Sequence, residues 1–326
     1  MSGFILLGFS VGRPSELLLA FLFFVIYVGA LGGNSIILCI VLSDSRLRTP
    51  MYFFLGNFSI LDIFFTSVTS PQLIWSLLSG DKSISFAGCM AQTYFYFFLG
   101  TVEFLLLTSM SYDRYAAICN PLQYHAIMSS QVCIQMVLGC WLGGFFSVLI
   151  PIIMISRLSY CKSNVINHFF CDSGPLLNLS CSDTHLIELM DFVLSSVVIL
   201  CSSVLTLVSY ICIITAIMRI STTTGRAKVF NTCATHLTMI SVTSGVSIFM
   251  YVTPSQKKTL DVRKIPALLT TIVCPFLNPF VFTLKNDLVK EVIRDMVKKS
   301  TKLTDDPFWG GCEKKGQNKK GVHEEM

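Results

Sequence analysis

Seven stretches of this chain are long and apolar enough to cross a lipid bilayer, and this pattern limits the fold more than any other feature. A helix needs about 20 apolar residues to span the hydrocarbon core. The stretches cover residues 17–42, 51–78, 84–112, 132–155, 192–218, 229–252 and 265–284. Of all residues, 53% are hydrophobic and only 13% are charged, whereas about a quarter are charged in soluble domains. We therefore expect an integral membrane protein.

A bundle of helices is the architecture that these stretches predict. Lipid offers backbone groups no hydrogen-bond partner, so each stretch is helical or part of a closed barrel. The strict alternation over ten-residue segments that a barrel needs is absent. We expect an all-α fold, a seven-transmembrane helix bundle, closely packed at Gly29, Gly33, Gly139, Gly143 and Gly144. Four prolines should kink or locally unwind their helices: Pro71, Pro151, Pro275 and Pro279.

The segment after the seventh stretch predicts a short amphipathic helix on the inner membrane surface. Over residues 286–299, apolar side chains recur at helical spacing, opposite Lys290, Glu291, Arg294 and Lys298. Residues 301–326 are polar and rich in Gly and Lys, so a disordered cytoplasmic tail is expected there. One seven-span domain thus covers residues 1–300.

The cysteines indicate which end of the bundle faces the oxidising side of the membrane. Cys161, Cys171 and Cys181 lie between the fourth and fifth stretches, and Cys89 begins the third, on the same side. These four thiols allow three pairings. Short-loop Lys and Arg residues do not settle the orientation, but the basic C-terminal segment favours the cytoplasm. We expect a multi-pass plasma-membrane protein with an extracellular N-terminus and a cytoplasmic C-terminus.

The formal net charge of +5 is spread over short loops and the C-terminal segment, not over one face of a fold. This distribution predicts contact with membrane lipid and no nucleic-acid partner. The first apolar stretch is too long for a cleavable signal peptide, so it should remain as a signal anchor.

Two acidic side chains, Asp62 and Glu103, lie inside the predicted spans, where ionisable groups are rare and usually functional. They could form a polar switch in the middle of the bundle, or a protonated, hydrogen-bonded pair that only packs helices. No nucleophile or set of metal ligands converges on them. We therefore expect no enzyme activity, no catalytic residue, no cofactor and no metal centre.

Five motifs follow one another along the chain. They are residues 4–9 (FILLGF), 47–55 (LRTPMYFFL), 110–119 (MSYDRYAAIC), 228–237 (KVFNTCATHL) and 275–280 (PFLNPF). In this order, over about residues 4–297, the chain resembles the odorant (olfactory) receptors, which are rhodopsin-class G-protein-coupled receptors. Residues 168–172 (HFFCD) and 180–183 (SCSD) are similar to the class II, or terrestrial, branch.

The resemblance implies a receptor that binds a small, neutral, volatile ligand and activates a heterotrimeric G protein of the stimulatory Gs or Golf type, raising cyclic AMP. Arg114 should pair with Asp113 at rest and be released on activation; alternatively, it is an interfacial arginine that extends to the lipid head groups. Lys228 offers charge to a G protein or only anchors the sixth span. The coupling and switch positions of the family match Asp113, Arg114, Tyr115, Tyr210, Lys228, His236, Asn278, Pro279 and Phe282.

The family also implies two disulfide bonds on the extracellular side, Cys89–Cys171 and Cys161–Cys181. It further implies a polar core that holds water or a sodium ion, formed by Asn34, Asp62, Glu103 and Asn278. A sequon at Asn178, on the outer side, makes the chain a candidate glycoprotein.

The ligand site is expected in the outer half of the bundle, on the third and sixth stretches, with a contribution from the fifth. Its candidate residues are Tyr96, Phe97, Leu99, Gly100, Thr101, Ser244, Ser247, Ile248 and Tyr251. Their polar groups are uncharged hydroxyls, which favours a mostly apolar ligand with one oxygen function. No acid stands on the outer third stretch to bind an amine. Alternatively, the aromatic rings only pack, and the hydroxyls bond to their own helix backbones.

Two positions depart from the family pattern. Ser244 replaces an aromatic residue, often Tyr, and Phe282 replaces the Tyr that ends the seventh-helix motif. Both belong to activation switches in the family, so a poorly signalling receptor is one alternative. A receptor of the same fold for a non-odorant ligand outside nasal tissue is another. A seven-span transporter is a third, but it would need more polar lining and inverted repeats.

Overall fold

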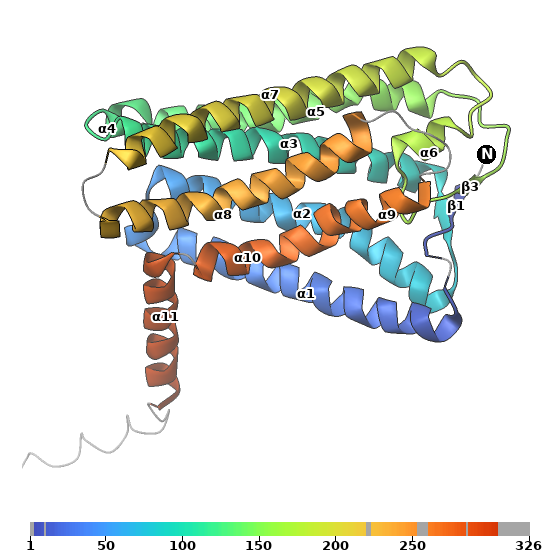
Figure 1. The fold of residues 1–326 in the computed structure, drawn as a ribbon. Coiled ribbons are helices and arrows are strands. Elements are labelled where there is room, and N and C mark those ends of the chain that lie inside the picture. Colours follow the sequence, from blue (N-terminus) through green and yellow to red (C-terminus); the bar gives the residue numbers. More distant parts are fainter. Residues whose placement is uncertain (1–2, 10, 220–222, 253–259, 285, 306–326) are drawn as a thin grey trace, which may run out of the picture. The chain divides into compact units, whose positions relative to one another are not determined.

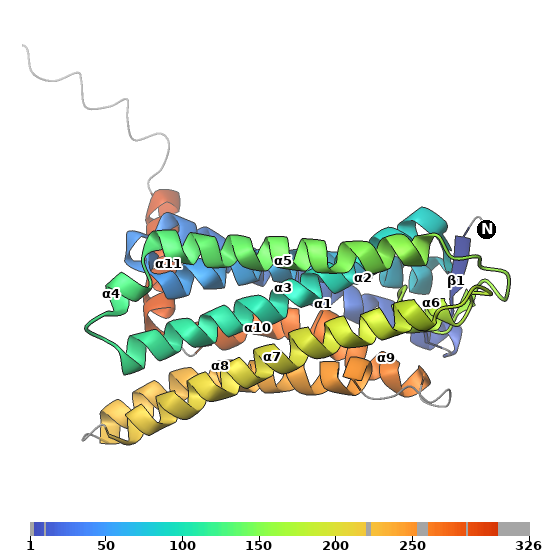
Figure 2. The same ribbon diagram turned by 90° about the horizontal axis from the view of Figure 1, so that it is seen from above.

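Long helices that run side by side form the body of the molecule (Figures 1 and 2). The computed structural model describes residues 3–9, 11–219, 223–252, 260–284 and 286–305. Its long helices are α1 (Arg13–Ser43), α2 (Pro50–Ser79), α3 (Phe86–Cys119), α5 (Ser130–Ser156), α7 (His185–Met218) and α8 (Thr223–Ser247). The π-helical segment η2 (Ile248–Val252) extends α8, and the last helix of the bundle comprises α9 (Leu260–Leu268), η4 (Leu269–Val273) and α10 (Cys274–Leu284).

Within the described residues, six helical segments are long and apolar enough to cross a membrane. They are α1, α2, α3, α5, α7 and the segment Arg263–Thr283. The helix α8, continued by η2, covers the remaining predicted stretch. The predicted seven-helix bundle is confirmed.

Local sequence signals set the helix ends. Ser85 and Ser129 precede α3 and α5, and each hydroxyl accepts a hydrogen bond from a backbone N–H of the first turn. Gly80 ends α2 with φ 78°, a conformation that favours glycine. Short connections follow at η1 (Ser45–Leu47) and α4 (Tyr124–Ile127), at the end of the bundle opposite the disulfide bonds (Figure 1).

The prolines disturb the helices less than expected. α2, α5 and α10 continue through Pro71, Pro151 and Pro279. Local unwinding is seen only before Pro275 among these four, where η4 takes the wider π-helical form just ahead of α10.

Glycines permit close helix contacts at three places. A Cβ atom on Gly33 would lie 3.0 Å from Pro279 of α10, and one on Gly29 would lie 2.6 Å from the ring of Phe276. A Cβ atom on Gly144 of α5 would lie 2.6 Å from Val102 of α3. Gly139, five residues earlier on α5, has no such neighbour within 4 Å. Close packing therefore depends on Gly29, Gly33 and Gly144 but not on Gly139.

A small β-sheet, which the all-α expectation did not include, covers the end of the bundle that holds the disulfide bonds. The strand β1 (Gly3–Leu6) pairs antiparallel with β2 (Ser83–Ser85) and parallel with β3 (Val165–Ile166). Phe4 and Leu6 point into a buried cluster with Ile166 and Leu176. Strands of two to four residues are too short for periodicity to predict, because their pairing partners come from distant loops.

The C-terminal segment forms a separate unit. Its helix α11 (Asp287–Asp305) has the expected amphipathic pattern and begins one residue after the start of the predicted helix of residues 286–299. It continues to Asp305, so residues 301–305 are helical and not part of a disordered tail. The remainder of the predicted tail lies outside the described residues.

We predict that Gly144→Ala destabilises the protein, whereas Gly139→Ala does not. The added methyl group of the first variant would overlap Val102, and overpacking of this kind costs about 1–3 kcal/mol. The second variant adds a methyl group in open space. The measurement is the melting temperature of the purified protein in detergent. Equal melting temperatures for the two variants would show that α3 and α5 do not pack through Gly144.

Candidate functional site

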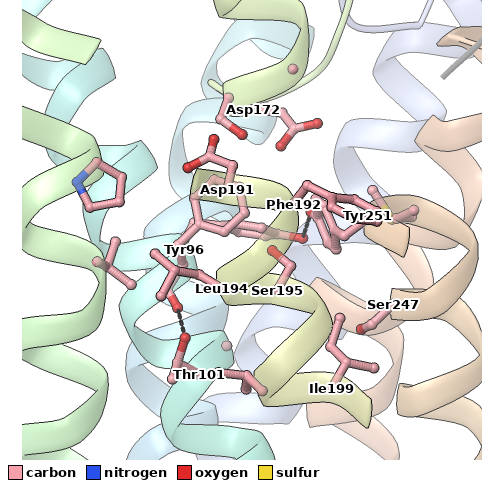
Figure 3. Close-up of a pocket in the computed structure, with 18 of the residues that line it drawn as sticks. Tyr96, Thr101, Asp172, Asp191, Phe192, Leu194, Ser195, Ile199, Ser247 and Tyr251 are labelled. Atoms are coloured by element: carbon pink, nitrogen blue, oxygen red, sulfur yellow. Dashed lines mark hydrogen bonds between the residues drawn. The ribbon is translucent and has the colours of Figure 1, made fainter. Parts of the chain in front are cut away.

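A cavity of about 590 Å³ opens between the helices near the disulfide bonds. Residues from α2, α3, α5, α7, α8, η2, α9 and η4, and from the segment between α5 and α7, line it. Six of the nine predicted ligand-site residues take part: Tyr96, Phe97, Gly100, Thr101, Ser247 and Tyr251. Figure 3 shows that Tyr96 and Tyr251 reach across the middle of the cavity, with Thr101 and Ser247 deeper.

The other three predicted residues do not line the cavity. Leu99 is buried in the main hydrophobic core. Ser244 faces α7, where its hydroxyl oxygen accepts a hydrogen bond from Ser203 at 3.2 Å. Ile248 also lies outside the lining, although its neighbours Ser247, Met250 and Tyr251 belong to it. A helix presents only part of its surface to a cavity, so a run of consecutive residues cannot all line one.

Most of the predicted hydroxyl groups already have partners within the protein. The hydroxyls of Tyr96 and Tyr251 are hydrogen-bonded at 2.9 Å, which joins α3 to η2. Thr101 donates to the carbonyl of Phe97, one turn back on its own helix, at 2.9 Å. For Thr101, the alternative of a local backbone bond therefore holds.

The face of α7 that lines the cavity is missing from the nine residues predicted from the sequence. This helix begins at His185 and not at residue 192. Glu188, Phe192, Ser195 and Ile199 lie on one face of the helix and line the cavity. The three- and four-residue spacing of these side chains is visible in the sequence, but many apolar residues of the same helix share it.

The expectation of an uncharged pocket is wrong. Asp172, Asp191 and Arg263 line its outer end, together with Glu188, and Glu103 lies deeper. Asp172 belongs to the loop between α5 and α7, which the folded protein places over the cavity. Burial raises the pKa of Asp172 to about 7, and the nearby positive charge of Arg263 partly offsets this effect.

The backbone beside Asp172 is attached to α3 by several bonds. Cys171 forms a disulfide bond with Cys89 at the start of α3, and Cys161 forms the second disulfide bond with Cys181. The Cys171 N–H donates to Gln92 at 2.9 Å, and the Thr93 hydroxyl lies 2.9 Å from the Cys171 carbonyl. The short helix α6 (Ser173–Leu177) then leads away from Asp172. Both predicted disulfide pairings are confirmed.

In the loop between α5 and α7, His168 is buried in an aromatic cluster. Its ring stacks on Phe169 and meets Phe170 edge-on. Burial, together with the positive charges of Lys264 and Arg263, lowers the pKa of His168 to about 3, so the ring is neutral at physiological pH. Lys264 donates to the Gly8 carbonyl at 2.9 Å and to Asn167 at 2.8 Å, which ties α9 to the N-terminal segment and the loop.

The predicted polar core is only partly assembled. Asn278 donates to Asp62 at 2.8 Å, and both residues are buried. Asn34 instead donates to the carbonyls of Ala30 and Pro275. Glu103 lines the cavity instead. No cluster of three or more metal-binding side chains occurs in the described part of the chain, and a sodium ion at this core stays a prediction.

At the opposite end of the bundle, the expected pairing of Asp113 with Arg114 is not seen. The buried Asp113 carboxylate accepts a hydrogen bond from Tyr124 of α4 at 2.7 Å, and no ion pair joins the two residues in the described structure. Tyr124 reaches the Asp113 carboxylate because the short helix α4 folds back beside α3. The order of residues along the sequence does not reveal this arrangement.

Other predicted switch residues also lie in this half of the bundle. The Tyr210 hydroxyl of α7 and Nδ1 of His236 of α8 are 2.6 Å apart and buried. Phe282 meets Phe58 edge-on, and Pro279 packs beside Gly33. The ring of Tyr115 lies 6.1 Å from that of Tyr112. Lys228 lies in α8, but its side chain is outside the described part of the structure.

We predict that Asn278→Ala lowers the melting temperature more than Asn57→Ala. The first variant leaves the buried Asp62 carboxyl without its donor, at a cost of about 1–3 kcal/mol. The Asn57 side chain donates to a carbonyl of its own helix. The measurement is thermal unfolding in detergent. If the two variants have the same melting temperature, the hydrogen bond between Asp62 and Asn278 contributes no stability.

Comparison with known proteins gives one consistent family. A sequence model of the olfactory receptor family matches residues 23–300. The chain is 61% identical to the human protein "Olfactory receptor 6J1" over 293 residues, which is 90% of this chain and 84% of that protein. It is 49% identical to the human "Olfactory receptor 6C4" over 92% of this chain and 97% of that protein.

Proposed function

The chain belongs to the olfactory receptor family of G-protein-coupled receptors, and on this basis we propose that it binds a small, neutral, volatile ligand and activates a Gs- or Golf-type G protein. Activation would raise cyclic AMP. The observation that carries this proposal is the cavity between α3, α5, α7 and η2, whose volume of about 590 Å³ suits a small molecule. Aromatic and aliphatic side chains, among them Phe97, Phe104 and Ile199, form much of its wall, which favours a ligand with an apolar body.

We propose that the disulfide end of the bundle is extracellular and that α4 and the end of α3 face the cytoplasm, in the plasma membrane. Disulfide bonds persist on the oxidising side, and two occur at the cavity end. The ligand would thus enter from outside. The family assignment does not support the transporter alternative.

The proposed route of signalling runs along α3 to its inner end. Tyr96 and Thr101 of α3 line the cavity, and Asp113 and Arg114 stand near the inner end of the same helix. A ligand that favours one arrangement of α3 relative to α8 would change the surface near Arg114. A movement of α8 would also change the contact between Tyr210 of α7 and His236 of α8.

We expect Arg114→Ala to abolish the ligand-dependent rise in cyclic AMP, because the G protein would lose a cationic contact at the cytoplasmic end of α3. The measurement is a cyclic-AMP reporter in cells, with surface expression followed by flow cytometry. Arg157→Ala removes a cation from the opposite end and serves as the control. A full response of Arg114→Ala at matched surface expression would contradict the proposed coupling.

The variant Gly100→Val tests the cavity itself. A Cβ atom on Gly100 has no neighbour within 4 Å, so the new side chain would occupy cavity space. Overpacking against a bound ligand costs about 1–3 kcal/mol, so the half-maximal concentration of the largest active ligands should rise about tenfold or more. Gly139→Val, on an exposed face of α5, is the matched control. Unchanged potency for large and small ligands alike would place the binding site elsewhere.

A further inference from the structure

The outer end of the cavity differs chemically from the rest of it. Figure 3 shows Asp172 and Asp191 at one end, with Thr101, Ile199 and Ser247 at the other. The residues near the inner end are mainly apolar or carry hydroxyls, some of which are already bonded within the protein. A ligand in this cavity therefore meets several carboxyl groups at the outer end, whereas Glu103 is the one acidic residue of the lining that lies deeper.

The Asp172 carboxyl is the least satisfied polar group of this outer end. Asp172 is 3% exposed and lines the cavity, yet its Oδ1 atom has no hydrogen-bond partner in the described structure. Buried polar atoms without partners are uncommon and costly. A carboxyl group accepts hydrogen bonds in either protonation state, and the bond is stronger when the group is ionised. The Oδ1 atom of Asp172 thus lacks a donor.

Asp172 is also held in place before any ligand binds. The adjacent Cys171 is fixed to α3 through the disulfide bond to Cys89 and through hydrogen bonds with Gln92 and Thr93. A preorganised acceptor loses little entropy on binding, so its hydrogen bond contributes more to affinity.

The charges around Asp172 favour a neutral donor over a cation. The negative charge of Asp191 raises the pKa of Asp172, whereas the positive charge of the guanidinium of Arg263, which lines the same cavity, lowers it and has the larger effect. A protonated amine would be stripped of water beside that guanidinium, which is costly. A hydroxyl group has a smaller desolvation cost and still donates one bond.

We propose that Asp172 receives the hydroxyl of an alcohol or phenol ligand, whose apolar body lies inward against Phe97, Phe104 and Ile199. This inference rests on the proposed function, because it assigns the head group and the orientation of the ligand in the same cavity. Ligands with acceptor-only oxygens, such as ethers, would find no donor from Asp172 in its ionised form.

The test is a matched panel on three carbon skeletons, assayed by cyclic AMP in cells that express the full chain. The skeletons are represented by 1-octanol, 2-phenylethanol and menthol, each compared with its methyl ether, its parent hydrocarbon and its primary amine. On each skeleton that activates the receptor, the alcohol should be at least about tenfold more potent than its ether. One charge-assisted hydrogen bond provides a difference in affinity of this size.

Variants then assign this preference to one residue. Asp172→Asn keeps the shape but adds a donating amide, so alcohol potency should fall about tenfold while ether potency holds or improves. Asp183→Asn is the control, since it removes the same charge from an exposed loop position outside the cavity lining. Surface expression is measured for each variant.

The outcomes separate the two proposals. If the wild-type receptor reaches the surface and responds to no member of the panel, the proposed function fails and this inference fails with it. If it responds, but ethers, hydrocarbons or amines match or exceed the alcohols, only the assignment of the head group is wrong. An unchanged alcohol preference in Asp172→Asn would also overturn it. If that variant does not reach the surface, the wild-type comparison decides.

Discussion

The lack of water in the hydrocarbon core is the constraint on which the rest of this structure depends. Backbone groups must be paired within each helix, so the chain crosses as long helices and irregular backbone collects at the two ends. The helix α7 illustrates the consequence for side chains. Leu200, Val204 and Ile211 are exposed on the surface that would meet lipid, whereas Thr206 and Tyr210 are buried. Thr206 and Tyr210 therefore lie inside, where they bond to Ser111 of α3 and His236 of α8.

Pairs of buried polar groups connect helices that are far apart in the sequence. Asp62 of α2 meets Asn278 of α10, and Tyr210 of α7 meets His236 of α8. At the cavity, the hydroxyl pair formed by Tyr96 joins α3 to η2. Because an unpaired polar group is costly in a low dielectric, each pair favours one arrangement of its helices over others. Such contacts are suited to a protein that must change between two arrangements when a ligand binds.

The disulfide end combines segments from four parts of the chain. The N-terminal strand β1 pairs with β2 and β3, and Lys264 of α9 bonds to Gly8. The Cys89–Cys171 bond then holds the loop against α3 and brings Asp172 to the cavity. An apolar bundle thereby acquires a polar, asymmetric end to its binding site. The loop thus adds a carboxyl group to the charged side chains that α7 and α9 already place at this end, Glu188, Asp191 and Arg263.

The sequence alone determined the helices and their number, because hydropathy over about 20 residues depends only on local composition. Its motifs also indicated the family, and six of nine proposed pocket residues line the cavity. Tertiary structure decided the rest. The packing of neighbouring elements decides which face of α3 lines the cavity and leaves Leu99 in the core. It also decides that Asp113 bonds to Tyr124. The charged end of the pocket could not be foreseen either, since Asp172 reaches it through a loop whose path is set by contacts distant in sequence.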